Sequence, residues 1–257
     1  MVKSLEVRDV SKRFAGVVAL DSVSLSIPRG RISAIIGPNG AGKTTVFNII
    51  TGYLRPSAGS CLLNGTPITG WPPNRVANDG VRRTFQMPRV FGSLSVRENV
   101  ELGYGMSTRE AVISALFRRR QERKRRAEWS PRVMEYLALV GLEDAAAVPA
   151  HRLGYAERKM VEIARILASG AEFILLDEPL SGIHSAARGR VMDVISGLPR
   201  HTGAGVCMIE HNVGAVMALA EQITVLDHGK VLAVGDSSSI RNNEAVMEAY
   251  LGTRSAE

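Results

Sequence analysis

The chain has 257 residues, of which 45% are hydrophobic and 22% are charged, as expected for a globular protein with one large α/β domain or a domain and a subdomain. No stretch approaches the ~18 consecutive apolar residues of a membrane span. Residues 1–7 lack a signal-peptide pattern, so we expect a cytoplasmic protein. The formal net charge of +7 leaves nucleic acid and an anionic membrane surface open as partners.

The first strands of the chain are predicted from alternating hydrophobicity in residues 5–10 and 20–27. Phe14 lies between them, on a predicted loop with a glycine close by. A phenylalanine most often packs into a core. Alternatively, its flat face would provide a platform for a nucleotide base.

A glycine-rich segment follows an apolar run at 31–36, which predicts a buried strand, and precedes 44–51, which predicts a helix that stops at Gly52. The segment fits G-x-x-x-x-G-K-[ST], and we call it the phosphate loop. Its residues are Gly37, Pro38, Asn39, Gly40, Ala41, Gly42, Lys43, Thr44 and Thr45. The glycines let backbone N–H groups approach a polyphosphate at a helix N-terminus. We expect Lys43 to reach the outer phosphates and the Thr44 hydroxyl to hold Mg²⁺.

The middle of the chain changes from strand to helix patterns. Residues 60–63 predict a strand with a tight Asn-Gly turn, 66–80 are expected to be irregular, and 81–86 predict a short strand that ends at Gln86. Strand signals then disappear. The helical patterns lie at 95–103, 109–127 and 131–140, with Pro131 at a predicted helix start. We interpret this region as a helical insertion in an α/β core.

A basic run at 118–126 holds much of the excess positive charge. It is consistent with a solvated helix face or, alternatively, with a contact to anionic lipid headgroups or a membrane partner. Nucleic-acid binding is the weakest of the three interpretations, because no aromatic residues interleave with the charges.

The remaining chain alternates predicted helices and strands, which favours a mostly parallel sheet covered on both faces. The helices are predicted at 157–169, 185–197 and 213–220, and the strands at 173–178, 206–209 and 222–226. Ligands of such sheets bind beyond the carboxyl ends of the strands. Five polar residues follow strand-like runs and are expected to converge near the phosphate loop: Gln86, Asp177, Glu178, Glu210 and His211.

These polar residues suit nucleotide hydrolysis. Asp177 would support Mg²⁺ directly or through water, and Glu178 would polarise the attacking water as a general base. His211 would contact the γ-phosphate or that water. The alternatives are a pair of solvated carboxylates at a strand end and a surface histidine.

The motifs in this order resemble those of ABC-type ATPases over essentially the whole chain. The phosphate loop, Gln86, Ile174–Pro179 and His211 are similar to the Walker A, Q-loop, Walker B and H-loop motifs, and Phe14 matches the adenine-stacking position. Segments 83–86, 91–100, 209–211 and 249–252 look like the ATP-binding subunits of branched-chain amino acid importers.

The resemblance implies an α/β P-loop ATPase core with an N-terminal antiparallel β portion and an inserted helical subdomain. The core would comprise 1–86 and 157–236, the helical subdomain 87–156, and a C-terminal helical tail 237–257. It also implies ATP and Mg²⁺ as ligands, with Gln86 as both a metal ligand and a catalytic residue.

In such ATPases two subunits enclose two ATP molecules and drive a membrane permease, so the resemblance places this chain peripherally on the cytoplasmic face of the inner membrane. Residues 86–100 would lie near the permease. A urea or amide importer and a lipopolysaccharide-type exporter share the motifs. A soluble ABC ATPase acting on nucleic acid usually has two cassettes or a zinc insertion, so we expect no nucleic-acid partner here. A non-hydrolysing regulator is a further alternative.

The segment that resembles the ABC signature departs from the usual L-S-G-G-Q pattern. It comprises Leu153, Gly154, Tyr155, Ala156 and Glu157. Here we call it the signature segment. Gly154 lacks the hydroxyl that would donate to the partner's γ-phosphate, and Glu157 adds a negative charge. His184 stands where the family's D-loop usually has Asp. We therefore favour a heterodimer with a second, non-identical ATPase subunit over a homodimer with two weak sites.

Overall fold

The computed structural model describes residues 3–105 and 119–251. The chain forms two compact units. The first unit comprises Met1–Arg83, Glu172–Pro179 and Ile195–Glu257, and the second comprises Thr84–Ala171 and Leu180–Val194. None of the described helices is both long and apolar enough to cross a membrane.

An antiparallel sheet opens the first unit, with strand order β2-β1-β4-β5. Its strands are β1 (Ser4–Phe14), β2 (Val17–Pro28), β4 (Ala58–Leu63) and β5 (Thr66–Pro67). Phe14 pairs with Val17, so the prediction that Phe14 lies on a loop is wrong. Ala15 and Gly16 alone connect the strands, with φ of 43° and 94°. Two successive positive φ angles match the right-handed twist of a hairpin, which allows the strands to continue up to the turn.

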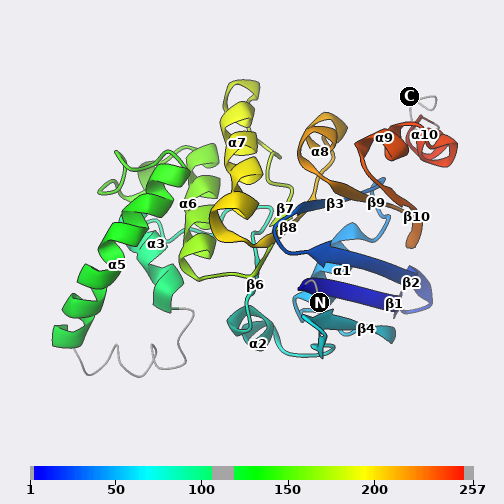
Figure 1. The fold of residues 1–257 in the computed structure, drawn as a ribbon, viewed down its shortest axis with the longest axis horizontal. Coiled ribbons are helices and arrows are strands. Elements are labelled where there is room, and N and C mark those ends of the chain that lie inside the picture. The colour runs from blue at the N-terminus through cyan, green and yellow to red at the C-terminus, as the bar shows by residue number, and fades with distance from the viewer. Residues whose placement is uncertain (1–2, 106–118, 252–257) are drawn as a thin grey trace. The chain divides into compact units, whose positions relative to one another are not determined.

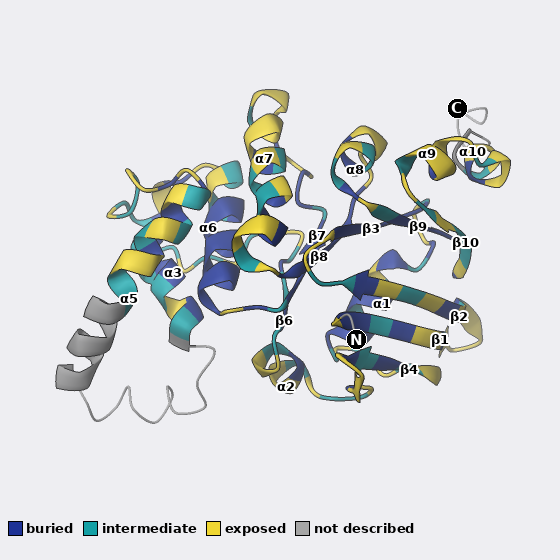
Figure 2. Ribbon diagram, viewed as in Figure 1, coloured by how far each residue is buried: buried dark blue, intermediate teal, exposed yellow. Residues whose placement is uncertain are grey.

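A second sheet of the first unit carries the predicted parallel strands in the order β10-β9-β3-β8-β7-β6 (Figure 1). They are β3 (Ile32–Ile36), β6 (Val81–Arg83), β7 (Phe173–Asp177), β8 (Gly205–Ile209), β9 (Gln222–Asp227) and β10 (Lys230–Gly235). The pairings are parallel except between β9 and β10. Every residue of β3, β7 and β8 is buried (Figure 2), as the unbroken apolar runs predict.

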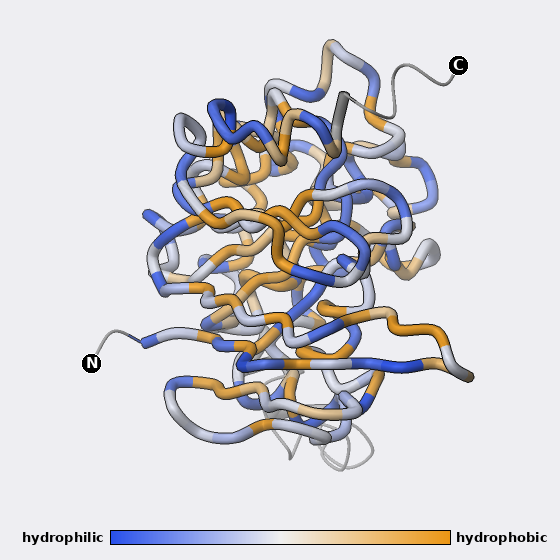
Figure 3. Tube along the Cα trace, turned by 90° about the vertical axis from the view of Figure 1, so that its right-hand side faces the viewer, coloured by the Kyte–Doolittle hydropathy of each residue, from blue (hydrophilic) through white to orange (hydrophobic). Residues whose placement is uncertain are grey.

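The helices of the first unit connect or follow these strands. They are α1 (Lys43–Ile50), α2 (Pro73–Asn78), α8 (Val213–Leu219), α9 (Ser237–Arg241) and α10 (Glu244–Leu251). The expectation that 66–80 is irregular is wrong in part, because β5 and α2 lie there. Pro73 begins α2 at the position where a missing N–H costs nothing, so a proline-rich stretch forms a short helix. Hydrophobic and hydrophilic stretches alternate along the trace (Figure 3).

The second unit contains α3 (Val96–Gly105), α5 (Arg119–Leu139), a 3₁₀ turn (Ala150–Arg152) and α6 (Tyr155–Ala168). Helix α7 (Ser185–Thr202) contributes residues to both units and extends beyond the predicted end at 197. The helices α3, α5 and α6 pack against one another. The prediction of an α/β core with an inserted helical region is therefore confirmed at the level of fold class.

Pro131 lies inside α5, so the prediction that a helix begins there is wrong. A proline removes one helical hydrogen bond and crowds the preceding turn. Contacts of the two preceding residues offset this cost: Trp129 stacks on Tyr104 with ring centroids 5.0 Å apart. The Arg97 guanidinium donates to Ser130 Oγ at 2.7 Å. Residues 109–118 of the predicted helix at 109–127 lie outside the described residues, as does Arg118 of the basic run.

Candidate functional site

The phosphate loop connects β3 to α1, and two of its glycines are required by close backbone neighbours. A Cβ at Gly37 would lie 2.0 Å from Leu226 O, and one at Gly42 would lie 2.8 Å from Ala19 O. Gly42 also has φ of 100°, which side-chain-bearing residues rarely adopt. The loop can therefore fold tightly only with glycine at these positions.

Lys43 is the first residue of α1, and only 6% of it is exposed. Its Nζ donates to Gly37 O at 2.7 Å and to Pro38 O at 2.8 Å. Burial lowers the pKa of Lys43, and the charge of Glu178 opposes this shift. The ammonium is thus held within the loop that would bind phosphate groups.

The remaining loop residues surround the N-terminus of α1, whose dipole favours anions. Asn39, Gly40 and Thr44 are exposed, whereas Ala41 is buried and Thr45 is half-buried. The Thr44 side chain lies in the first turn of the helix, so its hydroxyl is available to a bound ion. One helix end thus carries backbone N–H groups, a lysine and a hydroxyl. Together they form the donor set that a nucleoside triphosphate requires.

Asp177 ends β7 and is buried, with 7% exposed. Its Oδ2 accepts a hydrogen bond from Arg83 Nη2 at 2.6 Å, and Arg83 Nη1 donates to Asn48 Oδ1 at the same distance. Sequence reasoning missed Arg83 and Asn48. The available signal was a charged residue three positions before Gln86, in a run predicted to be a strand.

Glu178 follows directly and has φ of 48°, an unfavourable backbone conformation for a residue with a Cβ. Its N–H donates to Ile209 O at 2.9 Å, which fixes the turn at the end of β7. His211 Nε2 lies 3.1 Å from Glu178 Oε1. The structure therefore brings Glu178 and His211 into contact beyond the carboxyl ends of β7 and β8. Glu210 is buried beside them and accepts from His211 N at 3.1 Å.

Two other predicted site residues lie elsewhere in their units. Gln86 is an exposed residue of the second unit, and its carbonyl accepts from Tyr155 Oη at 3.0 Å. Phe14 is 42% exposed at the end of β1, with Lys12 Nζ 5.0 Å from its ring centroid. An exposed ring beside a cation has the form of a stacking platform, and its role as an adenine contact stays a prediction.

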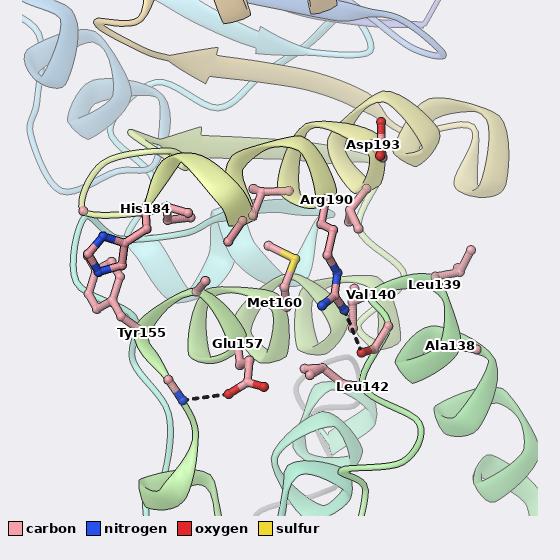
Figure 4. Close-up of a pocket in the computed structure, with 18 residues that line it drawn as sticks. Ala138, Leu139, Val140, Leu142, Tyr155, Glu157, Met160, His184, Arg190 and Asp193 are labelled. Carbon is pink, nitrogen blue, oxygen red and sulfur yellow. Dashed lines mark hydrogen bonds between the residues drawn. The ribbon is translucent and has the colours of Figure 1, made fainter.

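The signature segment leads into α6, with Gly154 as the residue before the first helical position. Glu157 Oε2 accepts a hydrogen bond from Gly154 N at 2.7 Å, so the carboxylate turns back onto the start of its own helix (Figure 4). Leu153 is buried, Tyr155 and Ala156 are half-buried, and Glu157 is exposed. The side chain of Glu157 therefore satisfies a backbone donor that would otherwise be available to an anion.

Lys159 of α6 connects this helix to the loop at 181–184. It is 4% exposed, donates to Ser181 O at 3.0 Å, and lies 5.3 Å from the Tyr155 ring centroid. A Cβ on Gly182 would lie 3.0 Å from the Tyr155 ring. The signature segment, this loop with His184, and parts of α5 and α7 line a cavity of about 680 Å³ (Figure 4).

Further along α6, two buried charged residues bind the segment that follows Gln86. Glu162 accepts from Arg89 N at 3.4 Å and Arg165 donates to Arg89 O. Burial raises the pKa of Glu162 to about 7, against the opposing charge of Arg165, whose nitrogen lies 3.9 Å away. The backbone of Arg89 is therefore bound at both its donor and its acceptor.

Comparison with known proteins agrees with this arrangement. Residues 20–181 match the family described as ABC transporter, and residues 230–256 match the family described as branched-chain amino acid ATP-binding cassette transporter. The chain is 35% identical to the high-affinity branched-chain amino acid transport ATP-binding protein LivG of Escherichia coli (strain K12), over 96% of this chain and 97% of that protein.

Two further similarities extend over nearly the full length. The lipopolysaccharide export system ATP-binding protein LptB of Acidithiobacillus ferridurans is 34% identical over 98% of each chain. A crystal structure of the ADP conformation of an ATP-binding cassette of an ABC transporter superposes with a TM-score of 0.83. It has 27% identity and covers 98% of this chain and 100% of that one.

Proposed function

The chain belongs to the family of ABC transporter ATPases, and from that premise we propose that it drives an importer of branched-chain or related amino acids. The observation that carries this proposal is the match of residues 230–256 to a branched-chain amino acid cassette family, because this stretch lies outside the motifs that all ABC ATPases need. Its described residues, 230–251, contain β10, α9 and α10 of the first unit. The relative in E. coli, named for branched-chain amino acid transport, supports the same cargo class.

The direction of transport is the main alternative. The similarity to LptB, named for lipopolysaccharide export, favours an exporter at almost the same identity. Reconstitution of the chain with its permease subunits in proteoliposomes distinguishes the two. ATP supplied on the side of the ATPase should drive accumulation of labelled leucine, isoleucine or valine in the compartment that contains the ATPase. Extraction of lipopolysaccharide without amino acid uptake would establish the exporter.

For ATP hydrolysis, we assign the phosphates to the phosphate loop and Lys43. Mg²⁺ takes oxygen ligands from one or two carboxylates and from phosphate groups, and when bound it neutralises charge on the phosphates. The Thr44 hydroxyl and the Asp177 carboxylate fit this preference as oxygen donors at a helix start and a strand end. Gln86 is the third residue assigned to the metal.

The proton transfer is assigned to Glu178 and His211. Glu178 would accept a proton from the attacking water, and His211, 3.1 Å from its carboxylate, would orient that carboxylate and contact the γ-phosphate. The backbone of Glu178 is held at φ 48° by its hydrogen bond to Ile209 O. This conformation fixes the position of the Cα from which the carboxylate side chain extends. A Glu178→Gln variant should retain ATP binding and lose turnover. Retained turnover would remove Glu178 from this role.

The proposed partners are membrane permease subunits, which would hold the chain peripherally at the cytoplasmic face of the inner membrane. Met87 and Phe91, which are 76% and 55% exposed, support a contact in the segment after Gln86. Exposed apolar side chains close together in sequence are typical of an interface. The basic run at 118–126 would contact anionic lipid headgroups. Stimulation of ATPase activity by DNA would contradict this set of partners.

We further propose that the second ATPase subunit is non-identical to this chain. Each composite ATP site of the family takes the Walker motifs from one subunit and the signature from the other. The hydrogen bond from Gly154 N to Glu157 supports a weak signature here, because it places a carboxylate where the partner's phosphate would bind. In a reconstituted complex, Glu178→Gln in this chain should reduce turnover more than the equivalent change in the partner. Equal losses would refute the asymmetry.

A further inference from the structure

Arg83 is the last residue of β6, the edge strand of the parallel sheet, and its backbone pairs with Leu175 of β7. Its side chain is 6% exposed, although the carboxyl end of an edge strand is a place from which an arginine can readily reach water. A guanidinium buried at such a position must be bound by specific partners.

The guanidinium bridges two elements of the proposed nucleotide site. One terminal nitrogen donates to Asp177 Oδ2 and the other donates to Asn48 Oδ1, both at 2.6 Å. The guanidinium also lies 5.4 Å from the ring centroid of Phe47. Asn48 and Phe47 belong to α1, the helix that begins with Lys43 and Thr44, whereas Asp177 ends β7. The planar fork of the guanidinium holds its two partners at fixed angles, whereas the ammonium of a lysine rotates freely about its stem.

Stability alone does not explain this pair. Buried ion pairs are often no more stabilising than apolar residues of the same volume. The pair does, however, define the orientation of the Asp177 carboxylate relative to the first turn of α1. It also assigns Oδ2 of that carboxylate to the guanidinium.

We propose that Arg83 is a positioning residue, which holds the Asp177 carboxylate against α1 and thereby sets the Mg²⁺ concentration that nucleotide binding requires. This inference rests on the proposed role of Asp177 toward Mg²⁺. The ion demands near-ideal octahedral geometry, so a carboxylate that can rotate supports it poorly. Loss of a partner that orients a metal-binding group typically costs about 10- to 100-fold in metal affinity.

The test measures nucleotide affinity of the full chain at a series of free Mg²⁺ concentrations, with a fluorescent ATP analogue and a chelator as the zero point. Arg83→Gln should raise the Mg²⁺ concentration for half-maximal enhancement about tenfold or more, and Asn48→Ala should raise it less. In the presence of the chelator, both variants should bind the nucleotide with the same affinity as the unchanged chain. Arg83→Lys, which keeps the charge and loses the fork, should behave like Arg83→Gln.

The control is Arg29→Gln, because Arg29 makes another arginine–carboxylate pair in the same unit, with Glu172 at 3.5 Å. It should leave the Mg²⁺ dependence unchanged. Asp177→Asn separates the two levels of the proposal: if it leaves the Mg²⁺ dependence unchanged, both the proposed metal role and this inference fail. If Asp177→Asn shifts the dependence while Asn48→Ala and Arg83→Lys do not, only the positioning role of Arg83 is overturned. Should Arg83→Gln fail to fold, Asn48→Ala and Arg83→Lys decide whether Arg83 has the positioning role.

Discussion

The phosphate loop of the first unit and the signature segment of the second are built alike and charged oppositely. Each places a glycine before a helix, Gly42 before α1 and Gly154 before α6. In each, a charged side chain turns back onto the nearby backbone. Lys43 donates to two carbonyl groups of its loop, whereas Glu157 accepts from the N–H of Gly154.

The difference teaches that a helix N-terminus alone does not decide whether an anion binds. Both helices begin with N–H groups that have no acceptor within the helix, and with a partial positive charge. Lys43 adds a full positive charge to the first, and Glu157 neutralises the second. We therefore expect a phosphate group to be attracted at the first segment and repelled at the second, in each case by a single side chain.

The largest effect is expected for Lys43→Ala. Loss of a hydrogen bond to a charged group costs roughly 1.5–3 kcal/mol, so ATP affinity should fall about 10- to 100-fold. Nucleotide titration monitored by fluorescence measures it. Lys230→Ala is the matched control, because Lys230 is an exposed lysine of the same unit that pairs with Asp21. If Lys43→Ala leaves the ATP affinity unchanged, Lys43 does not distinguish the phosphate loop from the signature segment.

A smaller effect separates the two glycines. Gly42→Ala places a side chain at φ 100° and close to Ala19 O, so it should reduce the free energy of unfolding by about 1–3 kcal/mol. Gly154→Ala should cost about 1 kcal/mol or less, because Gly154 has φ of −64° and only Glu157 lies near the added atom. Denaturant unfolding compares the two. Equal losses would show that backbone conformation does not distinguish the segments.

Removal of the negative charge should make the signature segment more like the phosphate loop. Glu157→Gln keeps an oxygen that can accept from Gly154 N. It also removes a repulsion of about 1 kcal/mol for a charge roughly 4 Å away. In a reconstituted heterodimer that also carries Glu178→Gln in this chain, the remaining ATP turnover comes from the site that this signature serves, and it should rise about fivefold. Reduced turnover would mean that the carboxylate takes part in the reaction.

The smallest effect is expected for Tyr155→Phe, which removes only the hydrogen bond to Gln86 O. Stability should fall by about 0.5 kcal/mol, at the low end for one neutral hydrogen bond, because this bond is exposed to solvent. Faster amide exchange at the residues after Gln86 is the second readout. If the exchange rates of this segment stay the same, Tyr155 does not hold it.

Most of the parallel sheet could be predicted because buried strands are written as local apolar runs, such as 173–177 and 206–209. The strand β10 and the helix α2 were missed. The first has four apolar residues between Lys230 and Gly235, but it is short and was overlooked, whereas the prolines of the second conceal its helical pattern. The motif residues could be predicted because their spacing is local, whereas Arg83 was missed because its partners lie 35 and 94 positions away.

The contacts of Arg89 with α6 have a mechanical consequence. Glu162 binds the N–H of Arg89 and Arg165 binds its carbonyl, so both peptide groups that flank this residue are fastened to one helix. Displacement of the neighbouring Met87 or Phe91 would break hydrogen bonds to two buried charged side chains, which is costly. We therefore expect α6 to move together with this segment, and α6 begins directly after Gly154 in the signature segment.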